Sequence, residues 1–413
     1  MRATNGVWQR NKNFRNLWMG KSGSLIGDWF NQVALGQVTL NLTGSLAAMG
    51  FVLLCRSLPS VVIGPFVSPI VDLYSKKAIM YMSDIVRAII VLIFFPASIL
   101  MHSDLFLYLG AFLLGLAGVL FNPAHQAALP SIVREDDLAE ANAFHSGTAG
   151  VISMIGALSG GLVASFLHPV FCFFVNAGSY AWSAYCISQV KWIEDRSENK
   201  KRSTYLRSLK QGFQEAVSNK PARAIIIIGI SWGFAGGGYA ILIPILGEIT
   251  FGMGGIGIGI LYAVDGAGML LGALIVKKLV GSHYRKATVY YGISYLIQAI
   301  FFALLAQSTH FGLAVLMLLF MRISSGIIVP LDTYLLQIHT PLKVRGRVFS
   351  LHSSTFMGVM QLSYASLGFL FETFGIPAMG IVIGVISFLC GLTWLFQLRN
   401  FQAPAQSEKD LSS

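Results

Sequence analysis

The chain has 413 residues, of which 55% are hydrophobic and 11% are charged. Soluble domains carry about 25% charged residues, so this composition excludes a protein that is wetted on all sides and indicates an integral membrane protein. On a soluble chain the formal net charge of +11 would suggest nucleic acid, but the positions of the basic residues explain it otherwise, and we expect no nucleic-acid partner.

Twelve apolar segments are long enough to cross a bilayer, for which a helix needs about 20 mostly apolar residues. In chain order they are residues 16–41, 46–72, 78–100, 105–128, 139–167, 169–190, 222–248, 255–279, 287–306, 309–337, 347–371 and 375–397. We therefore predict an all-α integral membrane protein with twelve transmembrane helices.

The basic residues lie on one side of this arrangement. If the N-terminus is inside, the inner loops and the two tails hold all but four of the 29 lysines and arginines, and the outer loops hold none. Because cytoplasmic loops are enriched in Lys and Arg, we expect a multi-pass protein of the cell membrane with both termini in the cytoplasm. An odd number of spans would mix the two sides, so this separation also supports twelve.

One long hydrophilic linker, residues 191–221, divides the chain. It separates an expected N-terminal six-helix bundle (1–190) from a C-terminal one (222–400), and residues 401–413 are expected to be a disordered cytoplasmic tail. Apolar residues recur in the linker at helical spacing beside basic ones, which favours an amphipathic helix on the inner membrane surface. A flexible tether is the alternative. The recurring residues are Leu206, Leu209, Phe213 and Val217.

The two halves are weakly repeated. Residues 122–126, which end the fourth span, align with residues 329–333, which end the tenth, and Pro123 and Pro330 lie 207 positions apart. Many transporters place their site between two pseudo-symmetric bundles that arise from such repeats. We therefore expect two pseudo-symmetric six-helix bundles.

Several motifs together carry a family resemblance. Residues 64–72 (GPFVSPIVD), followed by Lys76 and Lys77, resemble the signature between spans two and three of the major facilitator superfamily, and Asp84 and Arg87 fit the same neighbourhood. Two sets of residues are similar to matching stretches in the branch that contains macrolide-efflux and siderophore exporters: 121–130 with 138–143 in the first half, and 336–337, 340–341 and 345–350 in the second. The resemblance implies the major facilitator fold and transport by alternating access.

The resemblance also implies a conformational role for the first signature. Its residues in this chain are Gly64, Asp72, Lys76, Lys77, Asp84 and Arg87. By the same resemblance, Asp72 would lie by the N-terminus of span eleven, where the helix dipole favours a carboxylate. That contact would favour the outward-facing state; an ordinary interfacial Asp is the alternative.

The chain departs from the family pattern in two places. Leu73 stands where the first signature usually has a basic residue, and Ser68 where it often has glycine. The span-five signature of antiporters expects Gly-Pro-x-x-Gly-Gly, whereas residues 156–161 read GALSGG, without the proline. This second departure removes some of the support for antiport.

Each half has one acid and one base deep within apolar spans. At about 1.5 Å per residue, Asp28 and Arg56 lie near the bilayer midplane, as do Asp265 and Arg322. A charge at that depth costs roughly 2.5–3.5 kcal/mol, so it needs a partner or a watery cavity. We expect Asp28 to pair with Arg56 and Asp265 with Arg322.

These charges have two readings. In the first, they form inert ion pairs. In the second, at least one acid accepts a proton or meets a cationic substrate. A carboxylate in a partly dry cavity beside an arginine can be poised to titrate, because burial raises its pKa and the arginine lowers it. Asp28 is our first candidate for proton coupling and Asp265 our second. If the charges do not meet, the arginines are open to an anionic substrate instead.

Other residues give weaker indications. Four aromatic residues are expected either to line a cavity or to pack the core; they are Trp29, Phe30, Trp232 and Phe234. His125 and Asp332, near inner span ends, are expected at the interface rather than in a proton relay. The four cysteines lie in apolar segments without metal-site spacing, so we expect neither a metal nor a cofactor.

The leading hypothesis for function is export of a small organic molecule by a monomeric proton antiporter that is not an enzyme. No Gly-x-x-x-x-Gly-Lys-Ser/Thr fingerprint occurs, so ATP-driven pumping is not expected. The expected partners are the substrate (a drug-like compound or secondary metabolite), protons and the lipid bilayer. Transport of a lipid, lysolipid or other amphiphile is an alternative, and a non-transporting receptor or membrane enzyme is the alternative from another class.

Overall fold

The computed structural model describes residues 6–191, 214, 219–280 and 283–397, and every regular element in these ranges is helical. The long helices of the first half are α2 (Lys12–Thr43), α3 (Leu46–Ile63), α5 (Lys76–Leu100), α6 (Asp104–Gly118) with α7 (Phe121–Ile132), α8 (Leu138–Phe166) and α9 (Pro169–Ser188). Those of the second half are α11 (Lys220–Ile245), α12 (Gly254–Ile275), α13 (Tyr284–Ala306), α14 (Phe311–His339), α15 (Leu342–Phe374) and α16 (Ile376–Gln397).

Short elements extend or precede these helices. They are α1 (Val7–Arg10), α4 (Ser68–Leu73), the 3-10 turns η1 (Gly64–Phe66) and η2 (Glu135–Asp137), and the π-helical turns η3 (Leu246–Thr250) and η4 (Val276–Val280). The proposed linker helix and the C-terminal tail lie outside the described residues.

The long helices correspond to the predicted spans. Ten of them, counting α6 and α7 as one, are long and apolar enough to cross a membrane. The other two, α2 and α15, are longer still but more polar: α2 contains Lys21 and Asp28, and α15 contains His352 and Gln361. The two helices that are too polar to count as membrane spans by hydropathy are therefore those that carry these polar side chains.

Local sequence explains where helices end. Gly44 has φ 63°, a left-handed conformation that terminates α2 at little cost because glycine has no Cβ. Ser45 then caps α3, its hydroxyl accepting from the backbone N–H of Ala48 at 3.2 Å. The predicted break between spans one and two falls at this glycine.

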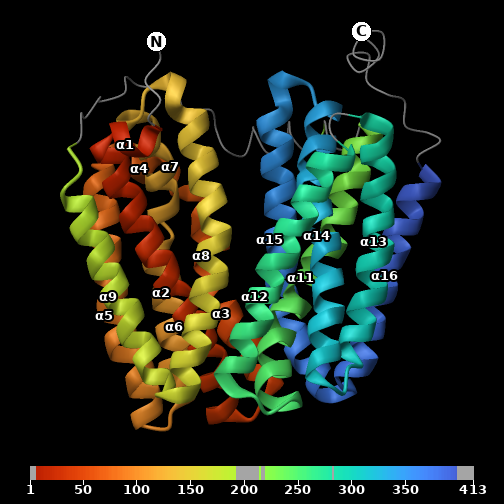
Figure 1. Cartoon of the computed structure of the whole chain (residues 1–413), viewed down its shortest axis with the longest axis horizontal. Coiled ribbons are helices and arrows are strands. Elements are labelled where there is room, and N and C mark those ends of the chain that lie inside the picture. Colours follow the sequence, from red (N-terminus) through yellow and green to blue (C-terminus); the bar gives the residue numbers. More distant parts are fainter. Residues whose placement is uncertain (1–5, 192–213, 215–218, 281–282, 398–413) are drawn as a thin grey trace. The chain divides into compact units, whose positions relative to one another are not determined.

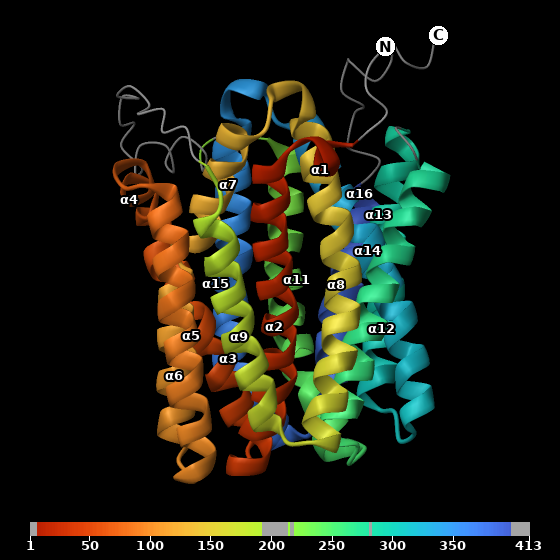
Figure 2. The ribbon, with the colours of Figure 1, turned by 60° about the vertical axis from the view of Figure 1, so that its left-hand side comes forward.

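The described chain forms two compact units by internal contacts. Unit 1 comprises residues 1–200 and 243–263; in it α2 packs against α8 and α9, and α5 against α6 and α9 (Figures 1 and 2). Small residues allow close helix packing: Gly161 of α8 lies against the backbone of Gly255, and an added Cβ would come within 2.6 Å of its carbonyl oxygen.

One end of unit 1 is tied by polar contacts. The backbone N–H of Val7 donates to Glu140 Oε1 at 2.8 Å, and Arg10 forms an ion pair with Asp137 at 3.2 Å. Val7 itself is buried in the apolar core at this end. These contacts attach α1 to the start of α8.

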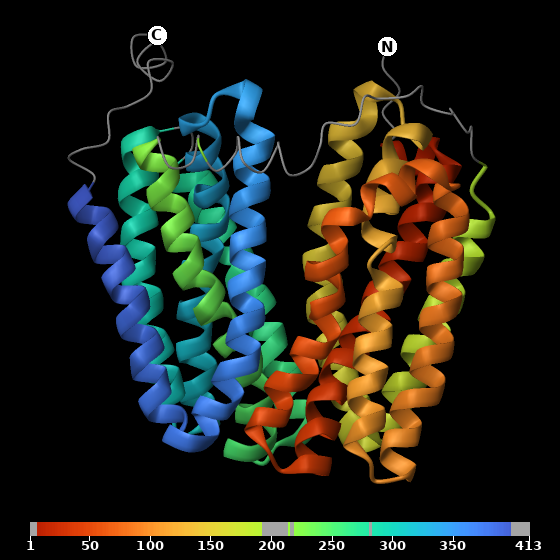
Figure 3. The ribbon, with the colours of Figure 1, turned by 180° about the vertical axis from the view of Figure 1, so that it is seen from behind.

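Unit 2 comprises residues 201–242 and 264–413, and its described helices include α13 packed against α14 and α16 (Figure 3). Trp394 of α16 is fully buried and its indole N–H donates to the carbonyl oxygen of Thr288 at 2.8 Å. Gly292 and Gly391 permit this approach, since a Cβ on either would lie within 3 Å of the neighbouring helix. The polar residues discussed next therefore project from a closely packed framework.

Candidate functional site

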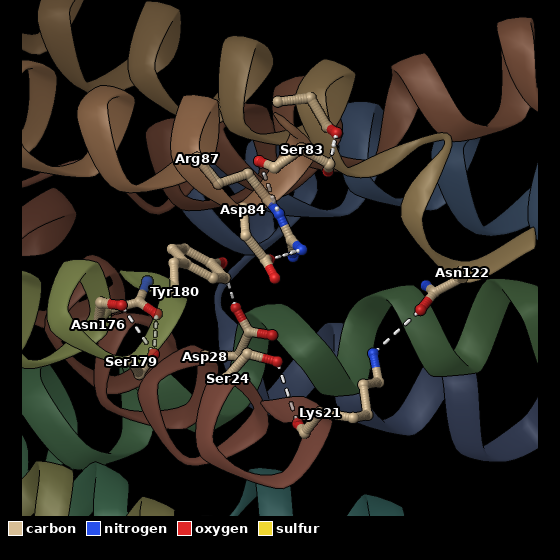
Figure 4. A network of polar contacts seen from close by, with 11 residues as sticks. Lys21, Ser24, Asp28, Ser83, Asp84, Arg87, Asn122, Asn176, Ser179 and Tyr180 are labelled. Atoms are coloured by element: carbon tan, nitrogen blue, oxygen red, sulfur yellow. Dashed lines mark hydrogen bonds and ion pairs between the residues drawn. The ribbon is translucent and has the colours of Figure 1, made fainter. Parts of the chain in front are cut away.

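Polar residues from four helices of unit 1 form one network (Figure 4). Asp84 and Arg87 lie one turn apart on α5 and form an ion pair, with side chains that are 0% and 8% exposed. The guanidinium carbon of Arg87 lies 4.3 Å from the ring centre of Phe121 and 4.4 Å from that of Tyr180. The cation is thus held between two aromatic faces and beside its own carboxylate.

Asp28 and Lys21 of α2 belong to the same network. The hydroxyl of Tyr180, on α9, donates to the Asp28 carboxylate, while Lys21 Nζ donates to Asn122 Oδ1 at 3.0 Å. The network therefore holds two acids and two bases on long helices of unit 1. Sequence reasoning missed Tyr180 and Asn122 as partners, although Lys21 could have been noticed as one of four basic residues inside the predicted spans.

The predicted pair of Asp28 with Arg56 is wrong. Nη1 of Arg56, on α3, donates instead to Oε1 of Gln32 at 2.8 Å, and Nε2 of Gln32 donates to the hydroxyl of Tyr262 at 3.2 Å. Gln32 lies one helical turn beyond Asp28 and supplies the nearer oxygen, while Asp28 is held by Tyr180. Equal depth in the bilayer was not enough to bring the two charges together.

The aromatic candidates lie in different surroundings. Trp29 is half-buried, with its ring centre 5.3 Å from that of Tyr262. Phe30 is buried against Gly160 of α8, and Trp232 meets Phe356 of α15 with ring centres 5.4 Å apart. The backbone carbonyl of Phe234 accepts a hydrogen bond from Ser363 of α15 at 2.7 Å.

In unit 2 the predicted pair of Asp265 and Arg322 is confirmed. The two side chains form an ion pair between α12 and α14, and each is about 15% exposed. The guanidinium carbon lies 4.5 Å from the ring centre of Tyr239. Gly268 brings the helices close, since a Cβ there would lie 2.6 Å from the Cβ of Arg322.

Asp332, which we expected near the inner end of its span, is buried among the helices of unit 2. It is 5% exposed, accepts from the hydroxyl of Tyr291 at 2.7 Å, and lies 2.9 Å from Nε2 of His352. α14 continues past Pro330 to His339, so Asp332 lies within the helix rather than at its end. Sequence reasoning did not consider His352.

His125 of the first half is buried as well. Its ring lies 5.3 Å from that of His145, between α7 and α8. The repeat offset of 207 positions relates His125 to Asp332 and also His145 to His352. Each half therefore places two polar side chains in contact at corresponding positions, and the repeat offset was the signal that could have found them.

Comparison with known proteins identifies the family. The chain matches the profile of the Major Facilitator Superfamily over residues 17–365. It belongs to this superfamily. Members of the superfamily are transporters, so the protein is a multi-pass membrane transporter and not an enzyme.

Relatives within the superfamily carry exporter names. A protein of Bacillus subtilis (strain 168) named bacilysin exporter BacE is 28% identical over 304 residues, which cover 71% of this chain and 73% of the relative. Macrolide efflux protein A of Streptococcus pyogenes is 24% identical over 350 residues, 83% of this chain and 85% of the relative.

Solved structures share the fold at low identity. A mutant of the nucleoside transporter NupG matches with a TM-score of 0.78 at 11% identity, over 94% of this chain and all of that one. A bacterial homologue of the iron transporter ferroportin matches with a TM-score of 0.69 at 16% identity, over 94% of this chain and 99% of that one. These likenesses support the two-bundle major facilitator fold.

The superfamily signature lies at one end of unit 1. Gly64 begins η1, Asp72 lies in α4, and Lys76 begins α5. Nζ of Lys77 donates to the carbonyl oxygens of Ser188 at 2.6 Å and Val190 at 2.9 Å, which join the start of α5 to the end of α9. A cation at these last carbonyls is favoured by the dipole of α9.

Metal binding has no support in the described ranges. No group of three or more His, Cys, Asp or Glu side chains there is placed to hold a metal ion.

Proposed function

We propose that this transporter exports a small organic molecule across the cell membrane by proton antiport, acting as a monomer through alternating access. One observation carries the proposal: Asp84 and Arg87 form an ion pair inside α5, a helix long and apolar enough to span a bilayer, and Tyr180 of α9 joins them to Asp28 of α2 (Figure 4). Ionisable groups within spanning segments are costly, and they mark substrate pathways and proton relays. The exporter names of the two relatives support the direction of transport.

Asp28 is the proposed proton-coupling residue. Among the described residues, Asp84 and Asp265 each form an ion pair with an arginine, whereas Asp28 accepts a hydrogen bond from a neutral tyrosine hydroxyl. Protonation of Asp28 therefore breaks no ion pair. Asp265 is the second candidate because protonation there would release Arg322.

Export from everted membrane vesicles tests the proposed function. With a panel of drug-like compounds and secondary metabolites, at least one compound should accumulate when a proton gradient is imposed, and collapse of the gradient should stop its accumulation. Vesicles from cells without the protein are the control. Accumulation that is indifferent to the gradient would contradict antiport, and movement of lysolipids alone would favour the amphiphile alternative.

The proposal places both termini in the cytoplasm. In a background with the four native cysteines replaced by serine, Asp104→Cys, Glu248→Cys and Glu372→Cys should each react in intact cells with an impermeant thiol reagent. Lys200→Cys should react only after the membrane is opened. Labelling of Lys200→Cys from outside would overturn this orientation, which rests on the inner position of the basic loops.

A further inference from the structure

The contacts of Arg56 differ from those of Arg87 and Arg322. Arg56 is the single charged residue of α3, an apolar helix of 18 residues. Within the part of the chain that the structure describes, no carboxylate lies within ion-pair distance of its guanidinium, in contrast to Arg87 and Arg322. A charge in such a helix needs either a partner or polar surroundings, and the contacts of Arg56 supply only a neutral one.

That neutral contact leaves most of the guanidinium available. An arginine has five N–H donors in a planar fork, and one of its nitrogens, Nη1, donates to Oε1 of Gln32 at 2.8 Å. Because a guanidinium only donates, the amide oxygen of Gln32 faces Arg56, and the amide nitrogen donates to the hydroxyl of Tyr262 at 3.2 Å. Arg56 is half-buried, and its guanidinium makes no second hydrogen bond to a residue that the structure describes.

An aromatic pair lies beside this polar group. The rings of Trp29 and Tyr262 meet edge to face with centres 5.3 Å apart, and Tyr262 also accepts the Gln32 hydrogen bond. Gln32 and Trp29 come from α2, Arg56 from α3 and Tyr262 from α12, all within unit 1. A cation, a neutral amide and two aromatic side chains from three helices thus converge on one place.

We propose that Arg56 binds a carboxylate of the transported molecule, with Gln32 and Tyr262 orienting the guanidinium and the Trp29 ring packing against an apolar or aromatic part of the same molecule. Planar carboxylates match the guanidinium fork and form paired, charge-assisted hydrogen bonds with it. This inference rests on the proposed function, because the ligand is the exported compound. It follows the alternative in which Asp28 and Arg56 do not meet and the arginine is open to an anionic substrate.

Binding to purified protein in detergent tests this inference without any gradient. The probes are N-acetyl-L-tryptophan and N-acetyl-L-tryptophanamide, which differ in the carboxylate, together with dipeptides that end in a free aromatic carboxylate and their amides. Binding is followed by the rise in thermal unfolding midpoint. The wild type should bind the acid about tenfold or more tightly than the matched amide, since a tenfold ratio requires only about 1.4 kcal/mol.

Two variants assign the preference to Arg56. Arg56→Gln removes the positive charge. Gln32→Glu places a carboxylate oxygen where the amide oxygen already contacts the guanidinium, so that the protein itself supplies the anion. Each variant should bind the acid and the amide equally. Gln32→Glu should also unfold at the wild-type temperature or above, which separates loss of binding from loss of folding. Arg134→Gln, at an exposed basic residue outside the long helices, is the control for net charge and should keep the preference for the acid.

Three results would overturn the inference: equal binding of acid and amide by the wild type, a preference that survives Arg56→Gln, or no carboxylate in the set that stabilises the wild type. These outcomes are separate from those of the vesicle experiment. A wild type that prefers the acid but shows no gradient-dependent transport would uphold the binding site and reject proton antiport. Gradient-driven export of compounds without a carboxylate would do the reverse.

Discussion

Asp28→Asn is expected to abolish proton-driven export while the protein inserts and folds normally. Asparagine keeps an oxygen that can accept from the hydroxyl of Tyr180, but it cannot exchange a proton. Because Asp28 accepts from a neutral hydroxyl and forms no ion pair within the described part of unit 1, its neutralisation should break no direct ion pair. The measurements are export by everted vesicles across a range of pH and the thermal unfolding midpoint in detergent.

Asp84→Asn is the matched control. Asp84 is fully buried and pairs with Arg87, so its neutralisation strands a buried guanidinium and should cost about 3–5 kcal/mol of folding stability. A stable Asp28→Asn variant beside an unstable Asp84→Asn variant would separate a coupling role from a structural one. If Asp28→Asn exports at the wild-type rate with unchanged pH dependence, Asp28 is not the coupling residue.

Loss of Arg322 alone is expected to be more damaging than loss of its charge together with that of Asp265. Removal of one member of a largely buried ion pair leaves a desolvated charge and typically costs about 3–5 kcal/mol, whereas neutralisation of both members is milder. Arg322→Ala should therefore lower the unfolding temperature more than the double variant Asp265→Asn, Arg322→Gln. The single variants Asp265→Asn and Arg322→Gln complete a cycle whose non-additivity measures the pairing.

The corresponding cycle in unit 1 serves as the control. Asp28 and Arg56 have separate partners, Tyr180 and Gln32, so losses in Asp28→Asn and Arg56→Gln should add. Strong coupling in this cycle, or strictly additive losses in the cycle of Asp265 and Arg322, would contradict the contacts described above. The two cycles use the same substitutions and the same measurement, so differences between them report the pairing itself.

The sequence by itself determined the membrane character of this protein, the twelve spans and the superfamily. These properties depend on local quantities: the length of apolar segments, the positions of Gly44 and Ser45 between spans, and short motifs such as residues 64–72. The expected side of the basic loops comes from sequence in the same way. Depth along a helix is also readable from sequence at 1.5 Å per residue, and for Asp265 and Arg322 it predicted the correct pair.

Only the tertiary structure decided which side chains meet at a given depth. Depth leaves open both the rotation of each helix about its axis and the identity of its neighbours, and these are determined by close packing at positions such as Gly160 and Gly268. Asp28 therefore meets Tyr180 rather than Arg56, and Arg56 meets Gln32. The buried contact of Asp332 with His352 likewise joins residues of two helices whose sequences do not show that they face each other. Sequence places charges along the membrane normal, whereas helix packing around them determines their partners.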